Sequence, residues 1–275
     1  MIFNSSKTIY TAKITLSSLL NQPYRPELNT TLNEKLDCYP NHEITNPPYP
    51  VLNVITFGYS GVDMLDSNLM DLKRAKHTAL DGALFKHAPF LVVPSGTVLT
   101  EDEKNKYRLK SKLEVLGIVY DAYYGIVIDR ISYDDRIFKV KINEGTSIMS
   151  PIDTKEDASI LSPIVKNNDN ITEFTNDYIL NSAMIKIQLD ATEVEKLVKN
   201  IKLIEGNEND IVISEIGLCT SIEEVIDDHK ESMWTQIAYF VDVSLDIQLK
   251  HPNDTYNDLE YIIDIGGMEP LSLPS

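Results

Sequence analysis

The chain has 275 residues and a formal net charge of −17 at pH 7, with 43% hydrophobic and 24% charged residues. These values are typical of a soluble globular protein that is long enough for one large domain or two modest ones. The excess of acidic residues argues against binding to nucleic acid or to anionic membrane surfaces, which need clustered Lys and Arg. An acidic surface suits solubility or a basic protein partner.

Sequence features that would mark a cofactor or a membrane protein are absent. The two cysteines, Cys38 and Cys219, lie in no metal-binding spacing, and we expect lone reduced thiols. The first residues lack the pattern of a secretory signal, and no apolar run approaches the roughly 18 residues of a membrane span. We therefore expect no metal, no cofactor, no small-molecule ligand and no membrane.

The N-terminal part divides into two segments. Residues 1–20 are predicted to form a strand, over 8–16, and a helical turn. Residues 21–50 contain six prolines, and because Pro fixes φ and removes a donor, regular structure is not expected there. We interpret 21–50 as an extended arm that lies on a neighbouring subunit; the alternative is a loop laid on its own domain.

Residues 51–145 are predicted to be a β-rich core. A strand over 51–57 is followed by a glycine turn and by a partly helical excursion over 63–87. An apolar run, Phe90 to Val93, is closed by Pro94, as at a strand end.

A helix and a hairpin are predicted to complete this core. Thr100 and Glu103 form a capping box for a short charged helix over 101–109. The β-prone runs 118–131 and 136–142 are expected to pair as a hairpin through a turn at 133–135.

Residues 146–180 are polar and predict an exposed loop, and residues 181–275 read as an α+β part that could belong to the same domain as 51–145. The firmest helix begins at Asp190 or Thr192 and ends near Ile204, with Gly206 just past its end. The other expected elements are strands at 183–189, 210–218, 240–249 and 259–265, the last two pairing with each other, and an acidic helix at 221–229 opened by a capping box of Ser221 and Glu224. Together these patterns predict an α+β fold, mainly antiparallel β, sandwich- or barrel-like, with a few short helices and the Pro-rich arm.

No motif carries a convincing catalytic or metal site. Gly58-Tyr59-Ser60-Gly61 follows a strand but lacks the Gly-x-Ser-x-Gly spacing of a nucleophile elbow, so a glycine turn is favoured. The Asp134-Asp135 and Asp227-Asp228-His229 groups are expected at turns, where Asp is common. His77 and His87 are expected to be packed or to satisfy turns. The sequence therefore predicts no catalytic residue and no enzyme.

Contact residues are predicted from the arm and from a tyrosine cluster. Tyr is enriched at interfaces, although sheet packing is the first interpretation of the tyrosines at 120–124. The candidate interface residues are Tyr24, Pro26, Pro47, Pro48, Tyr49, Tyr123 and Tyr124. The loop around 159–176 and the C-terminal tail are further candidates.

Two passages resemble structural proteins of tailed bacteriophages. LFKHAPFLVVPSGTVLTEDEKNKYRLK (84–110), followed by YDAYYGIVID (120–129), is similar to a pattern in neck, tail and baseplate proteins. ISEIGLCTSIEEV (213–225) resembles a strand end in baseplate and fibre-attachment proteins. The resemblance covers about a third of the chain, and it departs from the pattern at Cys219 and at the acidic helix expected after it. It implies a structural subunit, often in a ring, with no catalytic residues to carry over.

The expected function is therefore that of a structural subunit of a virion, in the neck, tail or baseplate, made in the host cytoplasm. Its partners would be other virion proteins and copies of itself. An acidic binding module that captures a basic protein partner is the alternative, and an enzyme with an undetected site is the third hypothesis.

Overall fold

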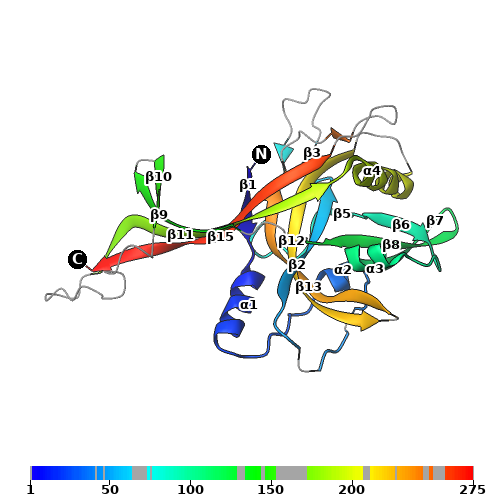
Figure 1. Cartoon of the computed structure of the whole chain (residues 1–275), viewed down its shortest axis with the longest axis horizontal. Helices are drawn as coiled ribbons and strands as arrows, with labels where there is room; N and C mark the ends of the chain where they lie inside the picture. Colours follow the sequence, from blue (N-terminus) through cyan, green and yellow to red (C-terminus); the bar gives the residue numbers. More distant parts are fainter. Residues whose placement is uncertain are drawn as a thin grey trace. The chain divides into compact units, whose positions relative to one another are not determined.

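The fold is α+β and mainly antiparallel β, and its two sheets are sandwich-like and do not close into a barrel (Figure 1). A computed structural model describes residues 2–40, 42–45, 47–63, 73–74, 76–128, 134–143, 146–152, 172–206, 211–226, 228–243, 248–249 and 258–274. The chain divides into two compact units. Unit 1 contains Met1–Asp129 and Ile187–Ile263, and unit 2 contains Arg130–Lys186 and Asp264–Ser275.

Unit 1 is built on one large antiparallel sheet. Its strands follow the order β15–β1–β13–β12–β2–β8–β6, with β5 on β2, β7 on β8 and β14 on β12. The strands are β1 (Ile2–Lys7), β2 (Val51–Tyr59), β5 (Lys86–Ala88), β6 (Leu91–Pro94), β7 (Tyr107–Val115), β8 (Ile118–Val127), β12 (Ile211–Ile226), β13 (His229–Asp242), β14 (Gln248–Leu249) and the first part of β15 (Leu259–Pro274). A small separate sheet pairs β3 (Val62–Asp63) with β4 (Lys73–Arg74).

The described residues of unit 1 include the helices α1 (Ile9–Leu19), α2 (Leu32–Lys35), α3 (Glu101–Lys106) and α4 (Ala191–Glu205). The prediction of α4 is confirmed. Asp190 and Glu193 form its capping box, and Gly206 ends it in the left-handed conformation with φ 66°. Its buried face consists of Val194, Leu197, Val198 and Ile201, as the apolar spacing predicted.

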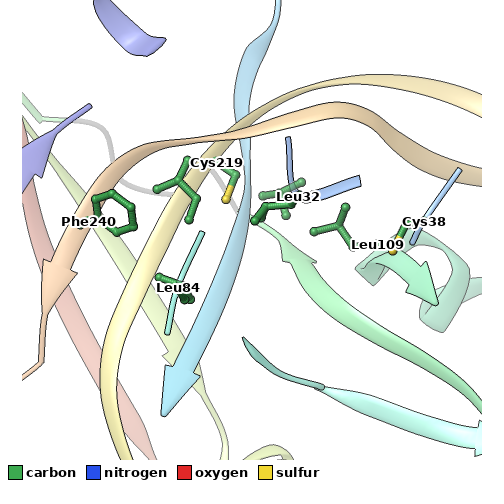
Figure 2. Close-up of a cluster of buried hydrophobic side chains, with 8 residues drawn as sticks. Leu32, Cys38, Leu84, Leu109, Cys219 and Phe240 are labelled. Atoms are coloured by element: carbon green, nitrogen blue, oxygen red, sulfur yellow. The ribbon is translucent and has the colours of Figure 1, made fainter. Parts of the chain in front are cut away.

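The core of unit 1 joins residues from distant parts of the chain. Figure 2 shows Leu32 and Cys38 beside Leu84, Leu109, Cys219 and Phe240. Both cysteines are free and buried, as expected, and burial raises the pKa of each thiol. These contacts place the Pro-rich segment inside the core of its own unit.

The interpretation of 21–50 as an arm on a neighbouring subunit is therefore wrong for its anchoring residues. Tyr24, Leu32, Cys38 and Ile44 are buried. Asn33 donates to the carbonyls of Cys38 (3.0 Å) and Ser232 (2.8 Å) and accepts from the N–H of Thr235 (2.8 Å). The prolines prevent a ladder, but the apolar residues between them anchor the segment to its own sheet, which is the alternative that the sequence left open.

Two segments have a different secondary structure from the one predicted. Residues 8–16, predicted as a strand, lie largely in α1, because Tyr10 and Ile14 also have the i, i+4 spacing that buries one helix face. Residues 221–226, predicted as part of a helix, continue β12. Ser221 donates its hydroxyl to Asn53 Oδ1 (2.8 Å), so its expected capping role is not realised.

The predicted hairpins are also wrong. The helix expected to reach residue 109 ends at Lys106, and β7 follows it and pairs with β8 through a two-residue turn. β8 does not pair with β9 (Asp134–Asn143); Asp134 and Asp135 lie in that strand, and residues 129–133 lie outside the described residues. β13 pairs with β12 and β1, whereas β15 lies between β1 and β11 (Thr172–Leu189).

Unit 2 is an antiparallel sheet in the order β10–β9–β11–β15, with β10 (Thr146–Pro151) at its edge. The polar stretch 146–180 is therefore strand at both ends, and its middle, 153–171, lies outside the described residues. In the described part of unit 2 the buried residues are Val140 and Ser182. Every residue of β10 is exposed, including Ile148 and Met149.

Candidate functional site

One cluster of unit 1 has the residue types of a catalytic site, so we consider it first. His77 lies between two carboxylates: its Nδ1 is 3.2 Å from Asp81 Oδ2, and its Nε2 contacts Glu215 Oε2. The side chains of His77 and Glu215 are 4% and 3% exposed. The imidazole ring also stacks on Phe240, with 3.9 Å between ring centroids. We call Asp81, His77 and Glu215 the acid–histidine cluster.

The contacts of the acid–histidine cluster serve the stability of the fold. Burial lowers the pKa of His77, but its hydrogen bonds with Glu215 and Asp81 outweigh burial, and the net shift is upward. When both ring nitrogens donate to carboxylates, the imidazole has no lone pair left for accepting a proton. Glu215 also accepts from the N–H of Phe85 (2.9 Å), so the cluster ties residues 77–85 to β12.

Gly58 gives the acid–histidine cluster its space. A Cβ at this position would lie 2.4 Å from Glu215 Oε1. Packing against the Glu215 side chain therefore explains why a glycine precedes Tyr59, Ser60 and Gly61. The chain continues from this turn into β3, so the helix that a nucleophile elbow requires is replaced by a strand.

A second acid and histidine pair lies on β13. His229 Nε2 is 3.3 Å from Glu231 Oε1. Burial raises the pKa of Glu231 to about 7 despite the lowering effect of Arg108, and burial together with Arg108 lowers the pKa of His229 to about 4. Both groups are therefore neutral near pH 6. Arg108 pairs with Glu223 at 2.9 Å and Lys110 with Asp121 at 3.1 Å, and both cations also lower the pKa of His229.

The described residues also bear on metal binding and on membrane insertion. Among them, no three His, Cys, Asp or Glu side chains come together in a way that could hold a metal ion. None of the helices in the described parts of the chain has the length and apolar content needed to cross a bilayer. Asp228, from the Asp-Asp-His group, forms the β12–β13 turn with φ 60°, and Asp227 lies outside the described residues.

Several predicted contact residues already make contacts inside unit 1. Tyr24 is buried and donates its hydroxyl to Gln236 Oε1, and Tyr123 is buried against Tyr107 and His229. The prediction that these two tyrosines form an interface is therefore wrong, because their rings fill the core. Tyr124 is half-buried against the core.

The remaining predicted contact residues lie at or near the surface of unit 1. The Tyr49 hydroxyl donates to Asn21 Oδ1 at 3.1 Å. Pro26 and Pro47 are half-buried, and Pro48 is exposed. The loop around 159–176 is described only from residue 172, where it forms part of β11, and the last residue of the tail also lies outside the described residues.

Apolar residues with exposed side chains lie at the end of the β7–β8 hairpin and in the loop before α3. They are Val98, Leu116, Ile118 and Val119, and we call them together the hairpin end. Leu116 is 96% exposed and Val98 is 87% exposed. The N–H of Ser95 donates to the Val119 carbonyl (2.9 Å), which fixes the neighbouring loop to this end of the hairpin.

Leu116 is also in an unfavourable backbone conformation. Val115 pairs with Ile118, so Leu116 and Gly117 form a two-residue turn, with φ 51° and 78°. Positive φ at both positions is the pattern of a type I′ turn, which favours Asn-Gly or Asp-Gly. A leucine there costs about 1–2 kcal/mol in the backbone and, being exposed, gains no burial in return. The hairpin end is our candidate functional site, and its expected role is binding.

The sequence contained a signal for this site. Apolar residues alternate through β7 at Tyr107, Leu109, Leu113 and Val115, and glycine follows the next residue. The capping box at Thr100 favoured a helix that continues to residue 109. That helix includes the first apolar residues of the alternation, so the β7–β8 hairpin was not predicted.

Comparison with known proteins identifies the family but no activity. Residues 3–275 match the model of DUF7208, a family of unknown function, and the chain belongs to that family. No curated protein and no solved structure matches the chain.

Proposed function

We propose that the chain is a structural subunit of a tailed-bacteriophage virion, in the neck, tail or baseplate, and that it works through contacts between subunits. The observation that carries the proposal is the hairpin end. Leu116 is exposed in a turn position where leucine opposes the fold. Residues that break a local rule without benefit to the fold are expected at functional sites. A contact with another protein chain would bury these side chains.

The edge of unit 2 supports the same role. β10 ends the sheet, and its sequence Thr146–Pro151 contains no Lys, Arg, Asp or Glu. Monomeric proteins protect such edges with charges or with covering segments, because an unpaired strand is a template for another chain. The exposed Ile148 and Met149 would be covered when a neighbouring subunit adds a strand or packs on the sheet.

The resemblance of 84–110, 120–129 and 213–225 to phage proteins gives the proposal its virion setting. The direct test is quantitative mass spectrometry of purified particles from a phage that encodes the chain. The proposal predicts a fixed copy number per particle that survives washing in high salt. A chain that is abundant in the lysate and absent from the particles would contradict it, and capture of one basic host protein there would support the alternative of a binding module.

A further inference from the structure

The hydrogen bonds between β10 and β9 determine which backbone groups of β10 lie at the outer edge of the unit 2 sheet (Figure 1). In an antiparallel ladder, alternate residues bond to the neighbouring strand, and the residues between them direct their N–H and carbonyl groups away from it. The N–H of Ile152 donates to the Ile137 carbonyl (2.9 Å), so the even-numbered residues of β10 bond to β9. The backbone groups of Ser147, Met149 and Pro151 therefore point outward.

β10 lacks the charges that protect another edge strand of this protein. In the described part of the chain, the only strand that pairs with β7 is β8, and β7 carries Arg108, Lys110, Lys112 and Glu114. Charged side chains of this kind discourage the addition of a further strand. The six residues of β10 are all exposed, and none of them is charged. Its outer edge is therefore suited to accept a strand.

Pro151 limits how a strand can be added to this edge. Proline has no N–H, so a residue placed opposite Pro151 would lose one of the two hydrogen bonds of that pair. Complete outward pairs are therefore confined to Ser147 and Met149. A partner strand that continues past Met149 gains little from its extra length, whereas a short strand that ends at the same point loses nothing.

A second copy of β10 satisfies this limit in one antiparallel register. In that register Ser147 of each copy lies opposite Met149 of the other, and each of the two pairs exchanges two N–H···O=C bonds, which gives four. A register centred on Met149 places Ser147 opposite Pro151, and one centred on Ser150 places Met149 opposite Pro151. A register centred on Ser147 pairs Met149 with residue 145, which precedes β10.

The same register brings matching side chains together. Ile148 lies on the two-fold axis, opposite Ile148 of the second copy, in a non-hydrogen-bonded pair with about 4.5 Å between Cα atoms. This side chain is 56% exposed in one copy, and the pairing would cover it. Thr146 lies opposite Ser150 on the same face. No charged residue of one β10 meets a charge on the other, although each chain carries −17.

We propose that two copies of this chain join their β10 strands in a two-fold symmetric, antiparallel contact, with Ile148 on the axis and Ser147 bonded to Met149. This inference rests on the proposed function, since it names the partner of the unit 2 edge that supports that function. The same surface of both copies forms the contact. A contact of this size is weak between free copies, so the experiment traps it covalently.

Cysteine cross-linking of the full chain tests the contact. Ile148→Cys places a thiol on the axis, within the Cα separation of about 4.4–6.8 Å that a disulfide spans. Met149→Cys is the matched control, because its thiol lies on the opposite face and opposite Ser147. Cys38 and Cys219 are buried and do not compete. Oxidised glutathione should convert at least tenfold more of Ile148→Cys than of Met149→Cys into disulfide dimers. Equal yields would overturn the proposal.

Two further variants test the register and the hydrogen bonds. Thr146→Cys and Ser150→Cys, one of them tagged, should each stay at the control level alone and should cross-link to each other when mixed. Adding Met149→Pro to Ile148→Cys removes an outward N–H and no bond to β9, and the dimer yield should fall at least tenfold. A mixture that does not cross-link, or a proline without effect, would overturn the proposal.

Particle composition separates this inference from the proposed function. The Ile148→Cys variant is oxidised in purified particles and in the isolated chain. A chain that has a fixed copy number in particles but forms no disulfide dimer in either sample refutes this inference and leaves the proposed function standing. A chain that forms the dimer in solution but is absent from particles supports the contact and refutes the proposed function.

Discussion

The acid–histidine cluster and the hairpin end are opposite cases within unit 1. In the cluster, the fold explains each residue: Gly58 gives space, Asp81 and Glu215 bind both nitrogens of His77, and Phe240 stacks on the ring. At the hairpin end, the fold argues against Leu116, which occupies a left-handed turn position and is exposed. The difference separates a part of unit 1 that serves stability from a part for which we propose a role in binding.

The largest effect should come from breaking the cluster. Glu215→Ala removes the buried carboxylate that binds His77 Nε2 and accepts from the Phe85 N–H. We expect a loss of about 3–5 kcal/mol in the free energy of unfolding, as for other broken buried ion pairs. Urea unfolding below the concentration of association measures it, with exposed Glu114→Ala as the control. A loss below about 1 kcal/mol would contradict the structural role.

A second test concerns the anchor of the Pro-rich segment. Asn33→Ala removes two hydrogen bonds that join this segment to β13, with Ser232 and Thr235, and one within the segment, to the Cys38 carbonyl. Leaving buried partners unsatisfied should cost about 2–3 kcal/mol. Assembly of the folded fraction should be unchanged, because the segment lies on its own unit. If the variant keeps full stability and loses assembly, the arm interpretation would be restored.

The His229–Glu231 pair gives a test by pH. The pKa of Glu231 rises from 4.5 to about 7 on folding, so its favourable protonated form is lost as pH increases through that interval. Glu231→Gln should match the unmodified chain below pH 4.5 and be more stable at pH 8, by about 1–3 kcal/mol. The comparison removes the opposite effect of His229, which is the same in both proteins. If the two proteins have equal unfolding free energies at pH 8 as well as at pH 4, the raised pKa of Glu231 is contradicted.

The smallest effect on stability, and the largest on binding, is expected at the hairpin end. Leu116→Asn should raise the free energy of unfolding of the monomer by about 1 kcal/mol, because Asn adopts the left-handed conformation more readily. Thermal or urea unfolding of dilute protein checks this. A destabilised Leu116→Asn variant would show that the leucine serves the fold, and the contrast with the acid–histidine cluster would disappear.

The parts that the sequence predicted are those governed by local chemistry. α4 was predictable because its capping box, apolar spacing and terminal glycine agree. A similar capping pattern, Ser221 with Glu224, was misleading, because β12 lies between β2 and β13 and sheet pairing overrides a local cap. Pairing partners such as β7 with β8 depend on contacts that no single segment contains, and so does the burial of Tyr24 and Tyr123.

The measurement that tests the central claim most directly is the mass of the unmodified chain and of Leu116→Asn across one concentration series, with unfolding measured on the same samples. The account predicts that the mass of the unmodified chain rises with concentration, and that Leu116→Asn stays at a lower mass and is at least as stable. Equal assembly by the two proteins would contradict the claim that the hairpin end is a contact between subunits.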